Sequence, residues 1–427
     1  MTKKVNIITL GCSKNLVDSE NLLGSLKARG MEVMHESNEA ADYVIINTCG
    51  FIGDAKEESI DTILRYAQGK KDGRFEKLFV TGCLSQRYAS HLKDEIHEVD
   101  GFYGTEDIPA ILNDLGFDPK KDLIADRFLT TPSHYAYLKI SEGCDRKCSF
   151  CAIPLIRGKH KSRSMESLVS EAEYLVSQGV KELILIAQDL NWYGKDLYKE
   201  QKLAELLEKL SDVQGVEWIR LHYAYPASFP VKVLDVMRER DIICNYLDIP
   251  LQHISDTVLK SMKRGINGHD TRKLVEEMRR SVPGVALRTT MLVGYPGETD
   301  DDFRELLQFV KESRFERLGV FTYSAEEGTS SFDLPDDVPD ELKQERMEEL
   351  LAVQQQISLE LNEAKLGKVF KVIIDGKEGD IMTGRTEYDS PEVDNEVIIR
   401  DTSLKQGAFY DIKVVSASEF DLFGEKV

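Results

Sequence analysis

Short apolar runs alternate with helical patterns along most of the chain, and this alternation is the feature that most restricts its fold. In the first segment Val5–Leu10, Tyr43–Asn47 and Lys77–Thr81 are predicted strands, and Val17–Ala28 has helical spacing. Strands separated by helices build parallel sheets with helices on both faces. We therefore predict an α/β N-terminal domain, residues 1–125, with a doubly wound parallel sheet.

The same alternation continues through a second segment, residues 131–360. About six strand–helix units over some 200 residues indicate a full or partial (β/α) barrel. The predicted strands are Tyr135–Ile140, Leu183–Ile186, Glu217–Leu221, Tyr246–Ile249, Ala286–Val293 and Leu318–Tyr323.

After Gly367 the pattern changes to short alternating runs with turn residues between them, such as Val369–Asp375 and Tyr410–Ser416. This spacing is typical of a small all-β domain. We predict such a domain over residues 365–427.

The chain has seven cysteines. No apolar run approaches the roughly 20 residues that span a bilayer. The apolar stretch after the first four residues is too short for a signal peptide. We therefore expect a cytoplasmic protein, in which cysteines are more often ligands or catalytic groups than disulfides.

The densest group is Cys144, Cys148 and Cys151, spaced C-x3-C-x2-C just after the first predicted barrel strand. Thiolates hold iron–sulfur clusters, and three of them on a four-iron cluster leave one iron open to a small molecule. Barrels of this kind carry their chemistry at that end of the strands. A zinc knuckle or chance clustering is the alternative, although zinc usually takes four ligands.

Three further cysteines, Cys12, Cys49 and Cys83, each come just after one of the first three predicted strands. The carboxyl ends of parallel strands lie at one edge of a sheet, where open α/β folds bind ligands. We therefore predict a second three-thiolate site. The alternative is three small buried side chains, since free cysteine packs well, and we expect Cys244 to be core packing of that kind.

The spacing of Cys144, Cys148 and Cys151, with the aromatic Phe150 before the last cysteine, resembles the hallmark of the radical-SAM superfamily. The resemblance implies that these three cysteines bind a catalytic 4Fe-4S cluster. It further implies that S-adenosyl-L-methionine binds the free iron and is reductively cleaved to an adenosyl radical.

The three N-terminal cysteines, the radical-SAM motif and the C-terminal β domain occur in the order found in the methylthiotransferase family, and the resemblance covers essentially the whole chain. It implies that Cys12, Cys49 and Cys83 bind a second 4Fe-4S cluster that holds or donates sulfur. It also implies that residues 365–427 form an OB-like TRAM domain.

Within this family Gly11–Glu20, Ile186–Asp189 and Tyr246–His253 resemble the RimO branch, which adds a methylthio group to an aspartate of ribosomal protein S-twelve. Ser13 departs from the proline that this branch often has there. The nearest alternative is the branch that modifies an adenosine in transfer RNA. A different class is a non-catalytic iron–sulfur protein that binds RNA through its β domain.

Phe150 and four other residues are predicted to contact S-adenosylmethionine. Gln188 and Asp189 end one predicted barrel strand, Arg288 lies on another, and Gly294 follows it. Capped or tight turns are the alternative explanation for these positions. The basic stretch Arg157–Arg163 can steer an acidic target or RNA, or it can be a solvated face.

The formal net charge is −20, which argues against broad nonspecific affinity for nucleic acid. Residues 365–427 hold 9 Lys/Arg and 13 Asp/Glu, and such acidity suits a basic ribosomal protein or merely keeps the chain soluble. The partners we expect are ribosomal protein S-twelve, free or in the small subunit, and an electron donor such as flavodoxin or ferredoxin. We expect no membrane contact, and nucleic-acid contact only through the ribosome.

Overall fold

A computed structural model describes residues 2–118 and 127–427, and the chain divides into two compact units. The predicted domain end at residue 125 lies outside the described residues. No helix of the described chain is long and apolar enough to cross a membrane. The first unit is Met1–Thr131, Glu142–Asp145 and Ala152–Lys159, and the second is Pro132–Ser141, Arg146–Cys151 and His160–Val427.

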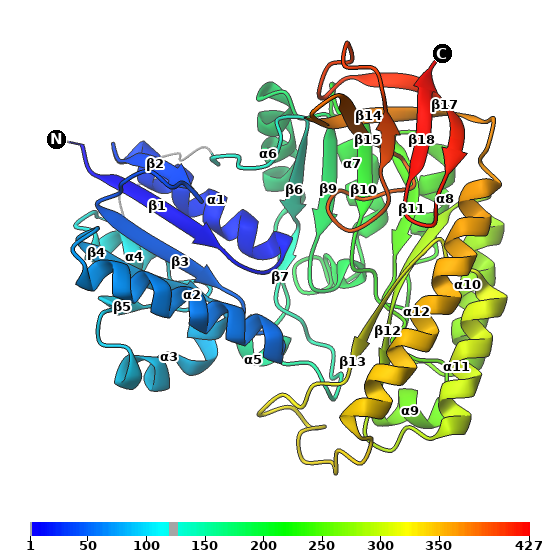
Figure 1. The fold of residues 1–427 in the computed structure, drawn as a ribbon, viewed down its shortest axis with the longest axis horizontal. Helices are drawn as coiled ribbons and strands as arrows, with labels where there is room; N and C mark the ends of the chain where they lie inside the picture. Colours follow the sequence, from blue (N-terminus) through cyan, green and yellow to red (C-terminus); the bar gives the residue numbers. More distant parts are fainter. Residues whose placement is uncertain (1, 119–126) are drawn as a thin grey trace. The chain divides into compact units, whose positions relative to one another are not determined.

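The first unit is built on a five-stranded parallel sheet with the order β2-β1-β3-β4-β5 (Figure 1). The central strands end together, because Thr9 lies opposite Asn47 and Asn47 opposite Thr81. The elements are β1 Lys4–Thr9, α1 Ser13–Ala28, β2 Glu32–His35, β3 Tyr43–Thr48, α2 Gly53–Lys71, β4 Lys77–Gly82, α3 Cys83–Glu95, β5 Gly101–Phe102 and α4 Ile108–Asp114.

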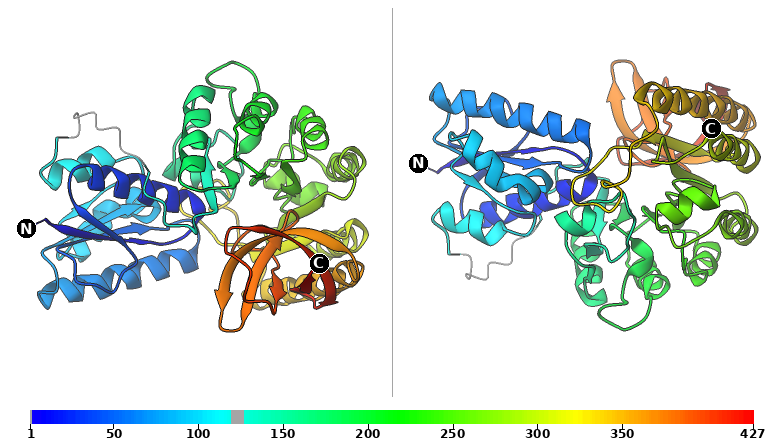
Figure 2. Two further views of the ribbon diagram at one scale, coloured as in Figure 1. Left: turned by 90° about the horizontal axis from the view of Figure 1, so that it is seen from above. Right: turned by 90° about the horizontal axis from the view of Figure 1, so that it is seen from below.

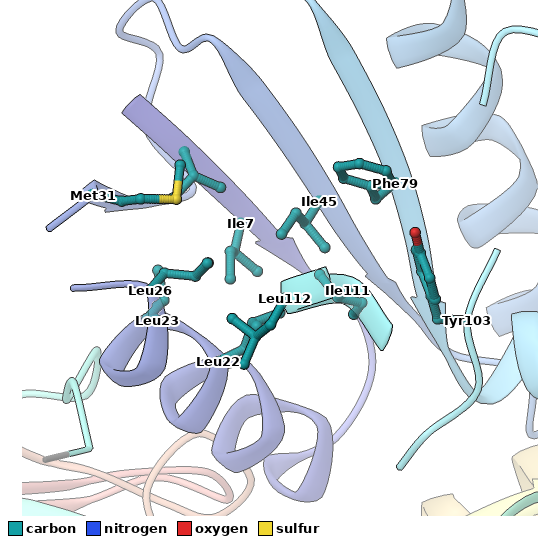
Figure 3. Packing of buried hydrophobic residues seen from close by; sticks show 11 residues of the cluster. Ile7, Leu22, Leu23, Leu26, Met31, Ile45, Phe79, Tyr103, Ile111 and Leu112 are labelled. Carbon is teal, nitrogen blue, oxygen red and sulfur yellow. The ribbon is translucent and has the colours of Figure 1, made fainter. Parts of the chain in front are cut away.

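Helices cover both faces of this sheet, because successive strand residues point to opposite sides. Ile7 and Phe79 pack with Leu23 of α1 on one face (Figure 3). Ile46 packs with Ile63 of α2 on the other face. Helices on both sides of the blue strands are visible in Figure 2. The predicted doubly wound parallel sheet is confirmed.

The second unit contains a six-stranded parallel sheet with the order β13-β12-β11-β10-β9-β6, which confirms the predicted partial barrel. Its strands are β6 Tyr135–Lys139, β9 Glu182–Ile186, β10 Trp218–Leu221, β11 Ile243–Asp248, β12 Ala286–Val293 and β13 Arg317–Thr322. Its helices are α6 Met165–Ser177, η1 Leu190–Trp192, α7 Leu203–Ser211, α8 Lys232–Glu239, α9 Asp256–Ser261, α10 Gly268–Ser281, α11 Asp300–Ser313 and α12 Asp340–Glu363. Three short elements, β7 Ser141–Glu142, α5 Ile153–Ile156 and β8 Lys161–Ser162, follow β6.

The C-terminal segment forms a small closed barrel with the strand order β14-β15-β16-β18-β17, as expected for an OB-like domain. Nine buried side chains fill it, among them Ile374, Val397 and Ile412. The strands are β14 Val369–Glu378, β15 Ile381–Thr386, β16 Val397–Ile399, β17 Phe409–Ala417 and β18 Leu422–Lys426.

Buried ion pairs join this small barrel to the partial barrel. Glu182 at the start of β9 is fully buried between Arg220 of β10 and Arg385 of β15, at 2.7 and 2.8 Å. Burial raises the pKa of Glu182, but the charges of Arg385 and Arg220 outweigh it and hold the pKa below its ordinary value.

Further acidic residues of the small barrel also form buried contacts with side chains of the partial barrel. Asp389 accepts hydrogen bonds from Arg317, with Nε at 3.1 Å, and Asp394 accepts from the Tyr246 hydroxyl at 2.7 Å. These carboxylates are buried and cannot face a partner. The acidity of residues 365–427 is therefore weaker support for a basic partner than the sequence suggested.

Candidate functional site

The three N-terminal cysteines converge where β1, β3 and β4 end. Cys12 is the N-cap of α1, Cys49 follows β3, and Cys83 begins α3. Burial, together with the nearby charges of Cys83 and Cys12, raises the pKa of the Cys49 thiol to about 11. At neutral pH this thiol is protonated unless a metal holds it as a thiolate.

Glycine allows the cysteine loops to approach one another. Gly11 has a φ of +89°, and a side chain there would place its Cβ 2.7 Å from Cβ of Cys49. Gly82 has a φ of +97°, and its Cβ would lie 2.5 Å from the Thr48 oxygen. Only glycine meets both requirements at these positions.

Polar side chains fix the same loops. The Asn15 amide donates to the carbonyls of Leu10 and Thr48 at 2.8 and 3.0 Å, so it links the ends of β1 and β3. The backbone N–H of Cys49 donates to the Ser59 hydroxyl at 3.0 Å. The site is therefore held by side chains from several elements of the first unit.

This arrangement fits an iron–sulfur cluster. Within residues 2–118 and 127–427, the buried hydroxyl oxygens of Ser13 and Ser85 have no hydrogen-bond partner. Ser13 directly follows Cys12, and Ser85 lies two residues after Cys83. Cluster sulfides accept such hydrogen bonds. No group of three or more His, Cys, Asp or Glu in the described chain could hold a single metal ion. In a cluster, by contrast, each thiolate binds a different iron.

At the radical-SAM motif, two polar side chains of the second unit lie against Cys148. Nη1 of Arg264 lies 3.2 Å from Cys148 Sγ, and the Tyr225 hydroxyl lies 3.4 Å from it. That hydroxyl also donates to the Arg264 carbonyl at 2.7 Å. Arg264 is buried, and its Nε has no hydrogen-bond partner among the described residues. The site therefore keeps one buried N–H donor for a bound group.

Arg146, inside the motif, is held by a stack of aromatic rings. Its guanidinium lies 4.1 Å from the ring centroids of both Trp192 and Tyr225. Its Nε donates to Asp189 at 2.7 Å. Asp189 also accepts from the backbone N–H of Asn191 at 3.0 Å, as the cap of η1. Asp189 therefore positions the motif, and its contact with S-adenosylmethionine stays a prediction.

The other predicted contacts have protein neighbours. Phe150 packs with a buried cluster that includes Tyr295, so it anchors the loop. Arg288 pairs with Asp248 and Asp394 at 3.2 and 3.3 Å, which occupies its guanidinium with the protein's own carboxylates. These residues stay predictions as cofactor contacts.

Gly294 and Gln188 complete the set of residues predicted to contact S-adenosylmethionine. A side chain at Gly294 would meet Lys343 of α12 at 2.2 Å, so packing already requires this glycine. Gln188 is half-buried just after β9. Their contact with S-adenosylmethionine stays a prediction.

The basic stretch that follows the motif is largely structural. Arg157 and His160 are buried, and Arg163 pairs with Glu171. The interpretation of residues 157–163 as one steering or solvated face is therefore wrong for Arg157, His160 and Arg163. Cys144, in the first unit, donates its backbone N–H to the Gly158 carbonyl at 3.1 Å.

The sequence pattern did not predict a site role for Asn15, Tyr225 or Arg264, and it placed Arg157 only in a basic stretch. Asn15 lies three residues after Cys12, one helical turn away, and this spacing was an available signal. The other three approach their cysteines through tertiary contacts, which no local pattern reveals.

The two groups predict the iron content of the protein. After anaerobic reconstitution we expect about eight irons per chain, four for each three-thiolate site. Replacement of Cys144, Cys148 and Cys151 by Ala should leave about four, measured by iron and sulfide assay. A reconstituted parent protein with four irons or fewer would contradict the N-terminal cluster.

Comparison with known families divides the chain into three matches. Residues 4–104 match a family described as uncharacterized protein family UPF0004. Residues 138–310 match the Radical SAM superfamily, and residues 366–427 match the TRAM domain.

Curated relatives match over nearly the full length. A Christiangramia forsetii protein named ribosomal protein uS12 methylthiotransferase RimO is 58% identical over 99% of this chain and 94% of its own length. The protein of that name from Bacteroides fragilis is 57% identical over 99% of both.

Among solved structures, the radical S-adenosylmethionine methyltransferase TsrM from Kitasatospora setae matches with a TM-score of 0.56 and 16% identity. The match covers 78% of this chain and 77% of that one. The cobalamin-dependent radical enzyme OxsB matches at 0.51 with 12% identity, over 83% of this chain and 56% of its own. These two likenesses show the fold.

Proposed function

Because the chain belongs to the RimO family of ribosomal protein uS12 methylthiotransferases, we propose that it replaces a hydrogen on the β-carbon of a uS12 aspartate with a methylthio group. It is then a radical-SAM enzyme that uses two 4Fe-4S clusters and S-adenosylmethionine. The observation that carries the proposal is the pair of three-cysteine groups, one at the sheet edge of the first unit and one in the loop after β6.

Each group has its own role in this proposal. Cys144, Cys148 and Cys151 hold the cluster that cleaves S-adenosylmethionine. The N-terminal cysteines hold the cluster that carries sulfur. With S-adenosylmethionine bound, the first cluster would supply a radical that abstracts hydrogen, and the second cluster would supply sulfur.

The residues around Cys148 orient this cysteine and fix the motif loop. Arg264 directs an N–H donor at the Cys148 sulfur, and Tyr225 holds the Arg264 carbonyl, so both residues orient this ligand. Phe150 fixes the motif by packing into an apolar cluster of the second unit. Acid–base side chains alone could not perform the reaction, because a β-C–H next to a carboxylate is barely acidic.

The partners follow from the substrate. We propose that uS12, free or in the small subunit, is the target, so that the enzyme acts in the cytoplasm. A one-electron donor such as flavodoxin or ferredoxin supplies the reducing equivalent. The family match favours this substrate over transfer RNA, the alternative target within methylthiotransferases.

Mass spectrometry of a deletion strain tests the proposal. We expect uS12 from the complemented strain to be heavier by about 46 Da on one aspartate, since SCH3 replaces H. The deletion strain should lack this gain, and its transfer RNA should be unchanged. A gain that appears on a transfer-RNA adenosine, with uS12 unmodified, would overturn the substrate and leave the reaction class standing.

A further inference from the structure

Arg157, the C-cap of α5, is buried against the N-terminal cysteine site of the first unit. Its Nη2 lies 3.5 Å from Cys83 Sγ and also donates to the Asn15 side-chain oxygen. Its Nη1 donates to Asp18 at 2.6 Å and to Glu142 at 3.3 Å. One guanidinium thus joins a cysteine, two carboxylates and the amide that ties the strand ends.

The packing around Cys83 fixes this contact. Cys83 lies in a small buried cluster with Ala152 and Ile156, which belong to the same short segment as Arg157. The side chain of Arg157 is 2% exposed, so it has no freedom to turn to solvent. Asp18 already meets the need of a buried cation for a counter-charge. The additional N–H directed at sulfur is not required for neutralisation, so it needs a separate explanation.

Hydrogen bonds and positive charge at a cluster's sulfur ligands act on its redox state. Reduction adds one negative charge, and a nearby guanidinium stabilises that charge more strongly in a buried site than in water. A group that hydrogen-bonds to a metal ligand also holds that ligand in place.

We propose that Arg157 is a positioning residue that raises the reduction potential of the cluster bound by Cys12, Cys49 and Cys83, with Asp18 moderating its charge. The inference rests on the proposed role of these cysteines as cluster ligands. It assigns to the segment just after the radical-SAM motif a direct influence on the second cluster.

The test uses the full-length chain with Cys144, Cys148 and Cys151 replaced by Ala, so that one cluster remains. Its midpoint potential is measured by redox titration followed by electron paramagnetic resonance. Arg157→Gln should lower the ratio of reduced to oxidised cluster about tenfold at fixed potential, a shift of about 59 mV to more negative values. Asp18→Asn should shift the potential in the opposite direction, because the guanidinium then loses the nearer of its two counter-charges and keeps only Glu142.

Two controls separate charge from folding. Arg157→Lys keeps the charge and should restore most of the shift. Lys159→Gln removes one positive charge from an exposed neighbour and should leave the potential unchanged. Opposite shifts for the Arg157 and Asp18 variants support the proposal, since a merely structural defect would move both the same way.

Three results would overturn it. Arg157→Gln could leave the potential at the value of the Lys159 variant. The Arg157→Gln and Asp18→Asn shifts could have the same sign. A parent protein that holds no reducible cluster would instead refute the assignment of the N-terminal cysteines, and with it the inference.

Discussion

Replacement of Cys12, Cys49 or Cys83 by Ala is expected to abolish methylthiolation of uS12 and to leave some reductive cleavage of S-adenosylmethionine. The motif cysteines Cys144, Cys148 and Cys151 are untouched in these variants, so their cluster still forms. Loss of a group that only orients a metal ligand costs about 10–100-fold, so loss of a ligand itself should lower product formation by more than ~100-fold. Chromatography of 5′-deoxyadenosine and mass spectrometry of uS12 measure the two reactions separately.

Cys244→Ala is the matched control. Cys244 is fully buried in a cluster with Trp218 and Tyr246 that contains no other cysteine, so its loss should affect neither product. Methylthiolated uS12 formed at the parent rate by the Cys12, Cys49 or Cys83 variants would refute the sulfur-carrying role.

Glu182→Gln is expected to lower the stability of the second unit by about 3–5 kcal/mol, because it leaves two buried guanidinium groups without their shared carboxylate. Arg220 and Arg385 have side chains that are 0% and 2% exposed and cannot reach water. The folded-state pKa of Glu182 is lowered. This stabilisation is therefore complete at neutral pH, and it is lost as the pH falls below the ordinary carboxyl pKa and through the lowered folded-state pKa of Glu182. Thermal unfolding at pH 7 and at pH 4 measures both effects.

Glu217→Gln provides the comparison. Glu217 also bridges the two barrels, through Lys181 at 3.8 Å and Lys371 at 3.3 Å, but all three side chains are solvent-exposed. Such pairs are worth about 0–1 kcal/mol. Equal destabilisation by the two substitutions would show that burial does not set the strength of the Glu182 contacts.

The sequence predicted the fold well where burial is periodic. Alternating strands and amphipathic helices identified the parallel sheets, since each must bury apolar faces at fixed intervals. The boundaries were less exact: Leu183–Ile186 begins one residue late, because the charged Glu182 does not look like a strand residue in a buried position. Its two arginine partners come from other strands, and a local pattern cannot show them.

The cysteine site was predictable for a topological reason. Parallel strands end at one edge, so residues just after them converge, as Cys12, Cys49 and Cys83 do. The side chains around the cysteines were not predictable in the same way. Arg157 looked like part of a basic surface stretch, and only the packing of α5 against Cys83 places it in the interior.

The buried ion pairs between the partial barrel and the small barrel also affect when the second unit can finish folding during synthesis. Arg385 and Asp389 are made some 200 residues after β9 begins, which at 5–20 residues per second is roughly 10–40 s later. Until then Glu182 can pair only with Arg220, and Arg317 lacks Asp389. A chain that stops short of the last barrel therefore keeps buried charges of the second unit without part of their compensation. The second unit gains its full set of buried ion pairs only when its final segment has been synthesised.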